Sequence, residues 1–441
     1  MFETFAAQRA LNMGRDWINR QRLSNLMILL YIVAVILSLS TGLLLAFRSS
    51  SEALDYDEWE YWTLSSDLLR GQFNDPGRRT LGFPVIIAAL RLVKDDFNFI
   101  QISMTFLASF APPILAWLTH RITGSKIAAV IAAVGLACWP PHLFLASSLY
   151  SELLALPILL LFLGILPLAS DTPPNRYLVW IVGGLLLGLL SHIRTMYQLF
   201  IPFLLLVMLF EGGGLKLIAM RWLLVIGGFL LIVSPWSLYV SEKAGSPMLL
   251  TANGGETLAG GFNSPILRYE TEEIKAERRS AWVGPGKWIP FTETGYLTKV
   301  EAKLPYTERD RLLRERTLNW LKENPSDGAY LVLRKLLYQW GLYPLDRSSL
   351  FQIAAGNIPS IFLLLSATLC LLFGRMTQIL PARIWLMPIF TAGIAIISWG
   401  SWRFRHPADA ALIIVVAVTI ALYFEQRPQP SKVLKESQAY E

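Results

Sequence analysis

Four carboxylates lie within six residues of one short stretch of this sequence. The stretch LDYDEWEYW, residues 54–62, supplies them as Asp55, Asp57, Glu58 and Glu60. Clustered carboxylates can take a proton from a substrate hydroxyl or bind a cation. A structural interpretation is also open, because Asp57 and Glu60 have the spacing of a capping pair for a helix that Gly71 would close. A cap accounts for one or two of the carboxylates and leaves the others unexplained.

The other conspicuous ionisable residues lie where apolar stretches end. They are Glu152, Arg194, Arg403, Arg405 and His406. The planar guanidinium of arginine matches phosphate oxygens, so the arginines indicate an anionic substrate. Arginines at the ends of membrane spans can also extend towards lipid head groups, which is the structural alternative. The histidine is interpreted as structural.

The elements that must position these residues are apolar helices. The chain has 441 residues, of which 54% are hydrophobic and 16% charged, and this composition is typical of an integral membrane protein. Runs of about 17 to 25 apolar residues, each able to cross a bilayer, recur along it, and residues 177–193 are predicted to be one of these spans. We therefore expect an all-α polytopic membrane protein with about ten spans, within a range of 10 to 12, and amphipathic juxtamembrane helices in the first outer loop.

The basic residues assign sides to these spans. Lys and Arg gather in the tails and in alternate short links, which is the positive-inside pattern and argues for a bilayer rather than nucleic acid as partner. The prediction is a multi-pass protein of the inner (plasma) membrane with both termini cytoplasmic. Its predicted parts are an N-terminal segment 1–24, a transmembrane core 25–240 with first outer loop 48–97, a largely helical extracytoplasmic cap 241–357, C-terminal spans 358–424 and a tail 425–441.

The ionisable residues then gather at the outer ends of the spans. A transporter more often places such groups near the bilayer midplane. An enzyme acting on a substrate whose head group lies at the outer surface fits this distribution better.

Several segments resemble one known family in the same order. They are DEWEYWTLSSDLLRG with RRTLGFPVIIAALRLV, PPHLFLASSLYSELLALPILL, GGLLLGLLSHIRTMY, SPWSLYV with its Gly-rich continuation, LNWLKENP with LVLRKLLYQW, and WRFRHPADAALII. Together they resemble the GT-C glycosyltransferases, in the branch of bacterial protein O-mannosyltransferases and the aminoarabinose transferase of lipid A. The chain differs at Tyr239-Val240, where that family has Arg-Asn.

This resemblance implies the GT-C fold and a transferase for a sugar carried on a polyprenyl phosphate, with inversion at the anomeric carbon. It implies Asp57 as general base, Glu58 as its substitute if the register shifts by one, and Glu152 as a second carboxylate that orients hydroxyls or helps to hold a divalent metal ion. No local ligand motif demands that metal. The implied phosphate-binding residues are Arg194, Lys335, Arg403 and Arg405. The lipid tail would lie in a groove with LGFPVIIAALRLV as one wall.

The acceptor would be a glycan, a lipid or a protein. Tyr61, four residues after Asp57, matches a family tyrosine and is assigned to the acceptor side. The stretch TANGGETLAGGFN, residues 251–263, lacks the spacing of a nucleotide-binding loop. It is interpreted either as a flexible surface loop or as an acceptor-side lid that includes Asn253, Gly254 and Gly255.

Two other functions stay open at this point. One is a polysaccharide polymerase or ligase that moves an oligosaccharide from a lipid diphosphate. The other is a flippase or a non-catalytic scaffold for lipid-linked sugars, which the lack of charge in the middle of the spans disfavours.

Overall fold

The computed structural model describes residues 28–44, 54, 56–72, 77–166, 177–265, 291–342, 357–373 and 376–425, and the regular elements in these ranges are helical. The all-helical prediction is confirmed. Three stretches of the described chain are long and apolar enough to cross a membrane: Phe97–Thr123, Leu215–Ala244 and Trp402–Phe424. A fourth is added if Lys126–Ala137 and Pro140–Ala146, which meet at a 58° bend, form one span. The count of ten spans stays a prediction.

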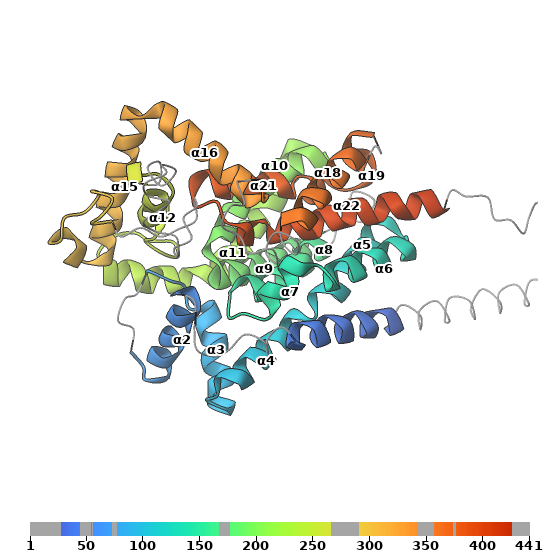
Figure 1. Ribbon diagram of the computed structural model, residues 1–441, viewed down its shortest axis with the longest axis horizontal. Coiled ribbons are helices and arrows are strands. Elements are labelled where there is room, and N and C mark those ends of the chain that lie inside the picture. Colours follow the sequence, from blue (N-terminus) through green and yellow to red (C-terminus); the bar gives the residue numbers. More distant parts are fainter. Residues whose placement is uncertain are drawn as a thin grey trace, which may run out of the picture.

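These helices form a bundle whose described chain begins and ends on the same side (Figure 1). Its long stretches are α4 (Phe97–Ala108) with α5 (Ala111–Thr123), α6 (Lys126–Ala137) with α7 (Pro140–Ala146), α11 (Leu215–Ala244), and α22 (His406–Glu425). Its shorter apolar helices are Ile28–Leu44, α3 (Gly82–Val93), α8 (Glu152–Ile165), α9 (Tyr177–Ile193), α10 (Phe200–Glu211), α18 (Ile358–Phe373), and α20 (Ala382–Trp385) with α21 (Met387–Ile397).

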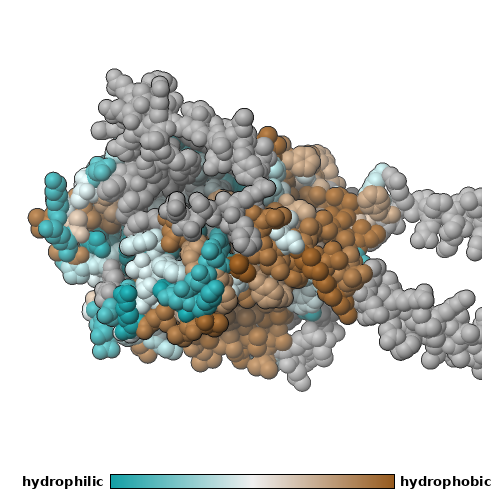
Figure 2. Space-filling model, turned by 60° about the horizontal axis from the view of Figure 1, so that its bottom comes forward, coloured by the Kyte–Doolittle hydropathy of each residue, from teal (hydrophilic) through white to brown (hydrophobic). Residues whose placement is uncertain are grey.

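More polar helices gather at the end of the bundle away from the two chain ends (Figure 1). They are α2 (Tyr56–Leu69), α12 (Gly254–Gly261), α15 (Tyr306–Glu323) and α16 (Pro325–Gln339). Figure 2 shows hydrophilic surface at this end and hydrophobic surface over the helices beyond it. The apolar and the more polar helices are therefore separated in space, and the predicted division into a transmembrane core and an extracytoplasmic cap stays a prediction.

Several predicted boundaries agree closely with the helices. The stretch 177–193 was predicted as one span and is α9, and the helix predicted from Glu58 to Gly71 is α2, after which Gly71 takes a left-handed conformation with φ of 67°. The predicted capping by Asp57 and Glu60 is wrong in its partners, because both carboxylates accept hydrogen bonds from arginine side chains instead. Asp55 lies outside the described residues.

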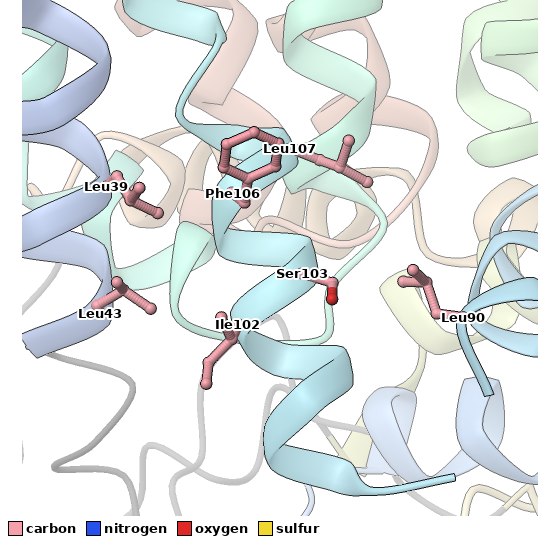
Figure 3. Close-up of a pocket in the computed structure, with 7 residues that line it drawn as sticks. All are labelled: Leu39, Leu43, Leu90, Ile102, Ser103, Phe106 and Leu107. Atoms are coloured by element: carbon pink, nitrogen blue, oxygen red, sulfur yellow. The ribbon is translucent and has the colours of Figure 1, made fainter. Parts of the chain in front are cut away.

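An apolar groove opens beside the wall that the sequence predicts for a lipid tail. It has a volume of about 390 Å³, and the residues lining it come from Ile28–Leu44, α3 and α4: Leu39, Leu43, Leu90, Ile102, Ser103, Phe106 and Leu107 (Figure 3). Its one polar lining side chain, Ser103, donates its hydroxyl to the carbonyl of Phe99 at 2.7 Å. The groove therefore offers apolar surface.

Helices α9 and α11 approach each other through glycines. A Cβ added to Gly184 of α9 would lie 2.1 Å from the carbonyl oxygen of Val225, and one added to Gly228 of α11 would lie 2.2 Å from that of Ile181. Small residues of this kind allow helix backbones to pack closely in membranes. Arg194 follows directly after α9, so this contact also helps to fix the backbone position of Arg194.

Two neighbouring glycines of α11 test this packing. We expect Gly228→Ala to destabilise the protein by about 1–3 kcal/mol, because the added methyl group must displace backbone atoms. Thermal unfolding in detergent measures the change. Gly227→Ala is the matched control, since nothing lies within 4 Å of its added Cβ. Equal melting temperatures for the two variants would contradict the close contact.

Candidate active site

Side chains from four distant parts of the chain meet in one ion-pair cluster at the polar end of the bundle. Asp57 and Glu60 come from α2, Arg78 and Arg79 from the segment before α3, Ser151 and Glu152 from the start of α8, Arg194 from the end of α9, and Arg403 from the 3₁₀ helix η4 (Trp402–Arg405). We call this set the arginine–carboxylate cluster. It brings together Asp57, Glu152, Arg194 and Arg403 of the residues predicted from the sequence.

Asp57 lies between two guanidinium groups. Its Oδ1 accepts from Arg79 Nη2 at 2.9 Å and its Oδ2 accepts from Arg403 Nη2 at 2.7 Å. Burial acts to raise the pKa of this carboxyl, but the two arginines outweigh burial and hold the pKa well below its usual range. The low pKa keeps this carboxylate ionised, and 23% of the side chain is exposed, so it is also accessible.

Glu152 is a buried carboxylate of the cluster. Its side chain is 4% exposed, and it pairs with Arg194 Nη1 at 2.6 Å and with Arg403 Nε at 3.6 Å. The hydroxyl of Ser151 accepts from Arg194 Nη1 at 3.2 Å and donates to Glu152 at 3.3 Å. Glu152 therefore holds the two arginines side by side.

Arg403 connects the two carboxylates. Its guanidinium pairs with both Asp57 and Glu152, and it lies over the ring of Tyr150, 4.3 Å from the ring centroid. Arg403 Nη1 is buried and has no hydrogen-bond partner among the described residues. This nitrogen is therefore an unused hydrogen-bond donor inside the cluster.

Arg79 was not predicted from the sequence, and Glu60 was assigned there only to a helix cap. Glu60 is buried, accepts from Arg79 Nε and Nη2 at 2.9 and 2.6 Å, and pairs with Arg78 at 3.0 Å. Glu60 thus aims the guanidinium of Arg79 at Asp57. The available signal was the pair of arginines in GRRTLGFP, which belongs to the predicted first outer loop, where the positive-inside rule expects few basic residues.

A glycine lets two parts of the cluster approach each other. A Cβ on Gly82 would lie 2.5 Å from the backbone carbonyl of His192. The start of α3 therefore abuts the end of α9, three residues after Arg79 and two residues before Arg194. A side chain at this position would push the two arginines apart.

The helix η4 that carries Arg403 is held against α7. Trp139 donates its indole N–H to Asp409 at 2.9 Å, a ring nitrogen of His142 lies 3.1 Å from one of His406, and Phe144 packs edge-on against Trp402. These three contacts form a seam along α7 and the start of α22. Because α7 leads into Ser151 and Glu152, the seam fixes Arg403 relative to them.

Two predicted phosphate ligands lie outside the cluster. The side chain of Arg405 is buried, pairs with Asp409 at 2.8 Å and donates to the carbonyl of Gln339 at 2.7 Å. Lys335 Nζ donates to the carbonyls of Ile396 and Ser398, both at 2.9 Å, and lies 3.4 Å from the ring centroid of Phe262. Their donors are engaged in packing α16 and α22 into the bundle, so neither enters the proposed phosphate site.

Tyr61 and Glu58 also face inward from α2. The hydroxyl of Tyr61, which is buried, donates to Ser151 at 3.2 Å, and its ring packs edge-on against Phe83. Glu58 Oε1 accepts the backbone N–H of Leu149 at 2.8 Å. Tyr61 therefore bonds to the cluster through Ser151, and the acceptor-side role assigned to it from the sequence stays a prediction.

The donor set does not suit a metal ion. Glu152 is the carboxylate that the family resemblance offered as a metal ligand, and it pairs with the guanidinium groups of Arg194 and Arg403. No group of three or more His, Cys, Asp or Glu side chains in the described ranges could hold a metal. We derive no step through one.

The glycine-rich stretch is a packed helix. Gly254 and Gly255 begin α12, and a Cβ on Gly255 would lie 1.9 Å from the carbonyl oxygen of Asp310 in α15. The interpretation as a flexible loop is wrong, because α12 needs these glycines to lie against α15. The lid role of Asn253, Gly254 and Gly255 stays a prediction.

Asp310 caps α12 from the neighbouring helix. Its carboxylate is buried and accepts the backbone N–H of Glu256 at 2.9 Å. Burial raises the pKa of Asp310 to about 6, against the lowering effect of the Glu256 and Gly255 amides and of Arg314. Asp310 belongs to α15, so its carboxylate stabilises the start of a different helix.

The raised pKa of Asp310 makes the cap sensitive to pH. The contribution of this group to stability is fully present below about pH 4 and is lost as the pH rises through about 6, because the folded state binds the proton more tightly. We expect Asp310→Asn, which is neutral throughout, to gain melting temperature relative to the wild type from pH 4 to pH 7.5. Glu315→Gln, at an exposed position of the same helix, is the control. A pH-independent difference for Asp310→Asn would contradict the assignment.

The similarity of this chain to known proteins is found among solved structures. No protein-family model matches it, and no curated protein matches it in sequence. Among solved structures it is similar to the archaeal oligosaccharyltransferase AglB from Archaeoglobus fulgidus, in complex with an inhibitory peptide and a dolichol-phosphate, with a TM-score of 0.49 and 15% sequence identity. The match covers 91% of this chain and 50% of that one, so this chain spans about half the length of AglB.

Proposed function

We propose that this protein is an integral membrane glycosyltransferase of the GT-C type, which transfers a sugar from a polyprenyl phosphate to an acceptor hydroxyl on the extracytoplasmic side. The observation that carries the proposal is the position of Asp57. This carboxylate is ionised, partly exposed, and flanked by Arg79 and Arg403 at the polar end of an apolar bundle. A proton acceptor and phosphate-binding cations are the two groups that such a transfer needs.

In the proposed reaction, the acceptor hydroxyl attacks the anomeric carbon and the bond from that carbon to the phosphate oxygen breaks. Asp57 orients the acceptor hydroxyl and takes its proton. The electron pair of the broken bond goes to the leaving polyprenyl phosphate. A single displacement of this kind inverts the configuration at the anomeric carbon.

The arginines perform the second task, which is to bind the phosphate. Negative charge grows on the phosphate as it leaves, and guanidinium groups already in place stabilise that charge without reorganisation. Arg403 fits this role because its Nη1 is buried and free of a hydrogen-bond partner among the described residues. Arg194, held by Glu152 at 2.6 Å, is the second phosphate ligand in the proposal.

The groove beside α3 is where we propose that the lipid tail lies. Helix α3 begins at Gly82, next to the cluster, and Leu90 lies eight residues further along, about 12 Å away at the helical rise. A tail that leaves the phosphate along α3 would therefore meet apolar surface within that distance.

The base assignment is tested by Asp57→Asn. We expect this change to abolish transfer, because the amide cannot take the proton. The protein should stay folded and still bind polyprenyl phosphate. Purified protein, a panel of polyprenyl-phosphate sugars, and mass spectrometry of the glycosidic product give the measurement. Asp67→Asn on the same helix is the control and keeps wild-type turnover. Wild-type turnover in Asp57→Asn would exclude Asp57 as the base.

The phosphate site is tested by a pair of arginines from one short segment. Arg403→Lys keeps the charge and loses the fork, so we expect the affinity for polyprenyl phosphate to fall about tenfold. Arg405→Lys disturbs a buried ion pair, so we expect a lower melting temperature with unchanged affinity of the folded protein. Binding is followed by native mass spectrometry. The opposite order of affinities would move the phosphate site to Arg405.

The same assay separates the alternatives. A polymerase or ligase that uses a lipid diphosphate would add several sugars in one event, and product masses report that number. A flippase would move labelled lipid across vesicles and form no glycosidic bond.

A further inference from the structure

Adjacent carboxylates in α2 point to different partners. Asp57 and Glu58 project about 100° apart around the helix axis. Asp57 meets the guanidinium groups, whereas Glu58 Oε1 accepts the backbone N–H of Leu149 at 2.8 Å. Leu149 is fully buried. Its amide therefore needs a partner inside the protein, because a buried N–H without one is costly.

Leu149 belongs to the turn between α7 and α8, residues 147–151. This turn carries Tyr150, whose ring lies beneath Arg403, and Ser151, whose hydroxyl contacts both Arg194 and Glu152. Glu152 follows as the first residue of α8. A shift of the turn would displace the groups that hold both proposed phosphate ligands.

Helix α4 holds the same turn from its other side. Gln101 donates its side-chain amide to the carbonyl of Ser147, and the hydroxyl of Thr105 donates to the carbonyl of Ala146 at 2.8 Å. All of these side chains bond to backbone atoms, so together they fix the path of the chain. Glu58 is the member of the set that comes from α2, next to Asp57.

We infer that Glu58 is a positioning residue, which locks the α7–α8 turn to α2 and so sets Glu152, Arg194 and Arg403 relative to Asp57. The inference rests on the proposed function for its kinetic consequence. It differs from the substitute-base role that the sequence suggested for Glu58. A base needs a charge, whereas a group that accepts an amide N–H needs only an oxygen at the correct distance.

Two substitutions of Glu58 distinguish the effect of its charge from the effect of its side-chain length. Glu58→Gln loses the charge and keeps a side-chain oxygen at the same distance, whereas Glu58→Asp keeps the charge and is one methylene shorter. We expect Glu58→Gln to keep kcat within about twofold of the wild type, with an unchanged pH profile. We expect Glu58→Asp to lower kcat by ten- to a hundredfold, in line with the effect of about 1 Å of misplacement.

The measurement uses full-length protein in detergent or nanodiscs, well below its melting temperature, so that a loss of stability alone leaves kcat of the folded protein unchanged. If Glu58→Asp exceeds Glu58→Gln in kcat, the carboxylate charge is what matters and the inference is overturned. If Glu58→Asp fails to fold, Gln101→Leu loosens the same turn from α4 and should lower kcat in the same way. A wild-type kcat in that folded variant would then overturn the inference.

Hydrogen exchange of residues 147–151 tests the contact without any substrate. We expect wild-type protection in Glu58→Gln and faster exchange in Glu58→Asp, and equal exchange in the two variants would overturn the inference. If the wild-type protein transfers no sugar from any donor in the panel, the proposed function fails. The exchange result still decides whether Glu58 holds the turn.

Discussion

The bond of Arg403 to two carboxylates is the interaction on which this structure depends. Asp57 and Glu152 lie at the edge of an apolar bundle, where an unpaired charge is costly. The same guanidinium pairs with both. This requirement draws α2, the start of α8, the end of α9 and η4 to one place. The seam between α7 and α22 and the glycine contact of α3 with α9 are the packing that makes the convergence possible.

Chemically similar carboxylates have different roles in the cluster because they are buried to different degrees. Asp57 is accessible and its pKa is held low, whereas Glu152 is enclosed and orders two arginines. Glu60 aims Arg79, and Glu58 bonds to a backbone amide. The acidic stretch looks like one feature in the sequence, but its carboxylates have three different roles. Asp57 and Glu60 lie on one face of α2 and share Arg79, whereas Glu58 bonds to the turn that contains Leu149. Asp57 is partly exposed and can therefore meet a substrate.

Much of the fold was predictable from the sequence, and little of the pairing was. Apolar length and the glycine after the helix gave α9 and α2 nearly to the residue, because those signals are local. One partner of Asp57, Arg403, lies far along the chain, and spacing alone assigned Asp57 to a cap of its own helix. The choice between Arg403 and Arg405 also required the structure, since both share one short segment and only their surroundings differ. Local patterns describe elements, whereas charge pairing depends on how the elements meet.

The distance along the chain between Asp57 and Arg403 has a consequence for biogenesis. These partners are 346 residues apart, and Arg403 enters with the segment that precedes the final described helix. A chain still on the ribosome therefore carries Asp57 and Glu152 without the cation that both of them share. The cluster is completed only when α22 joins the bundle. A protein that lacks η4 and α22 keeps most of its apolar helices but has no Arg403, so that Asp57 is left with Arg79 and Glu152 with Arg194, and the two carboxylates are no longer joined through a shared cation.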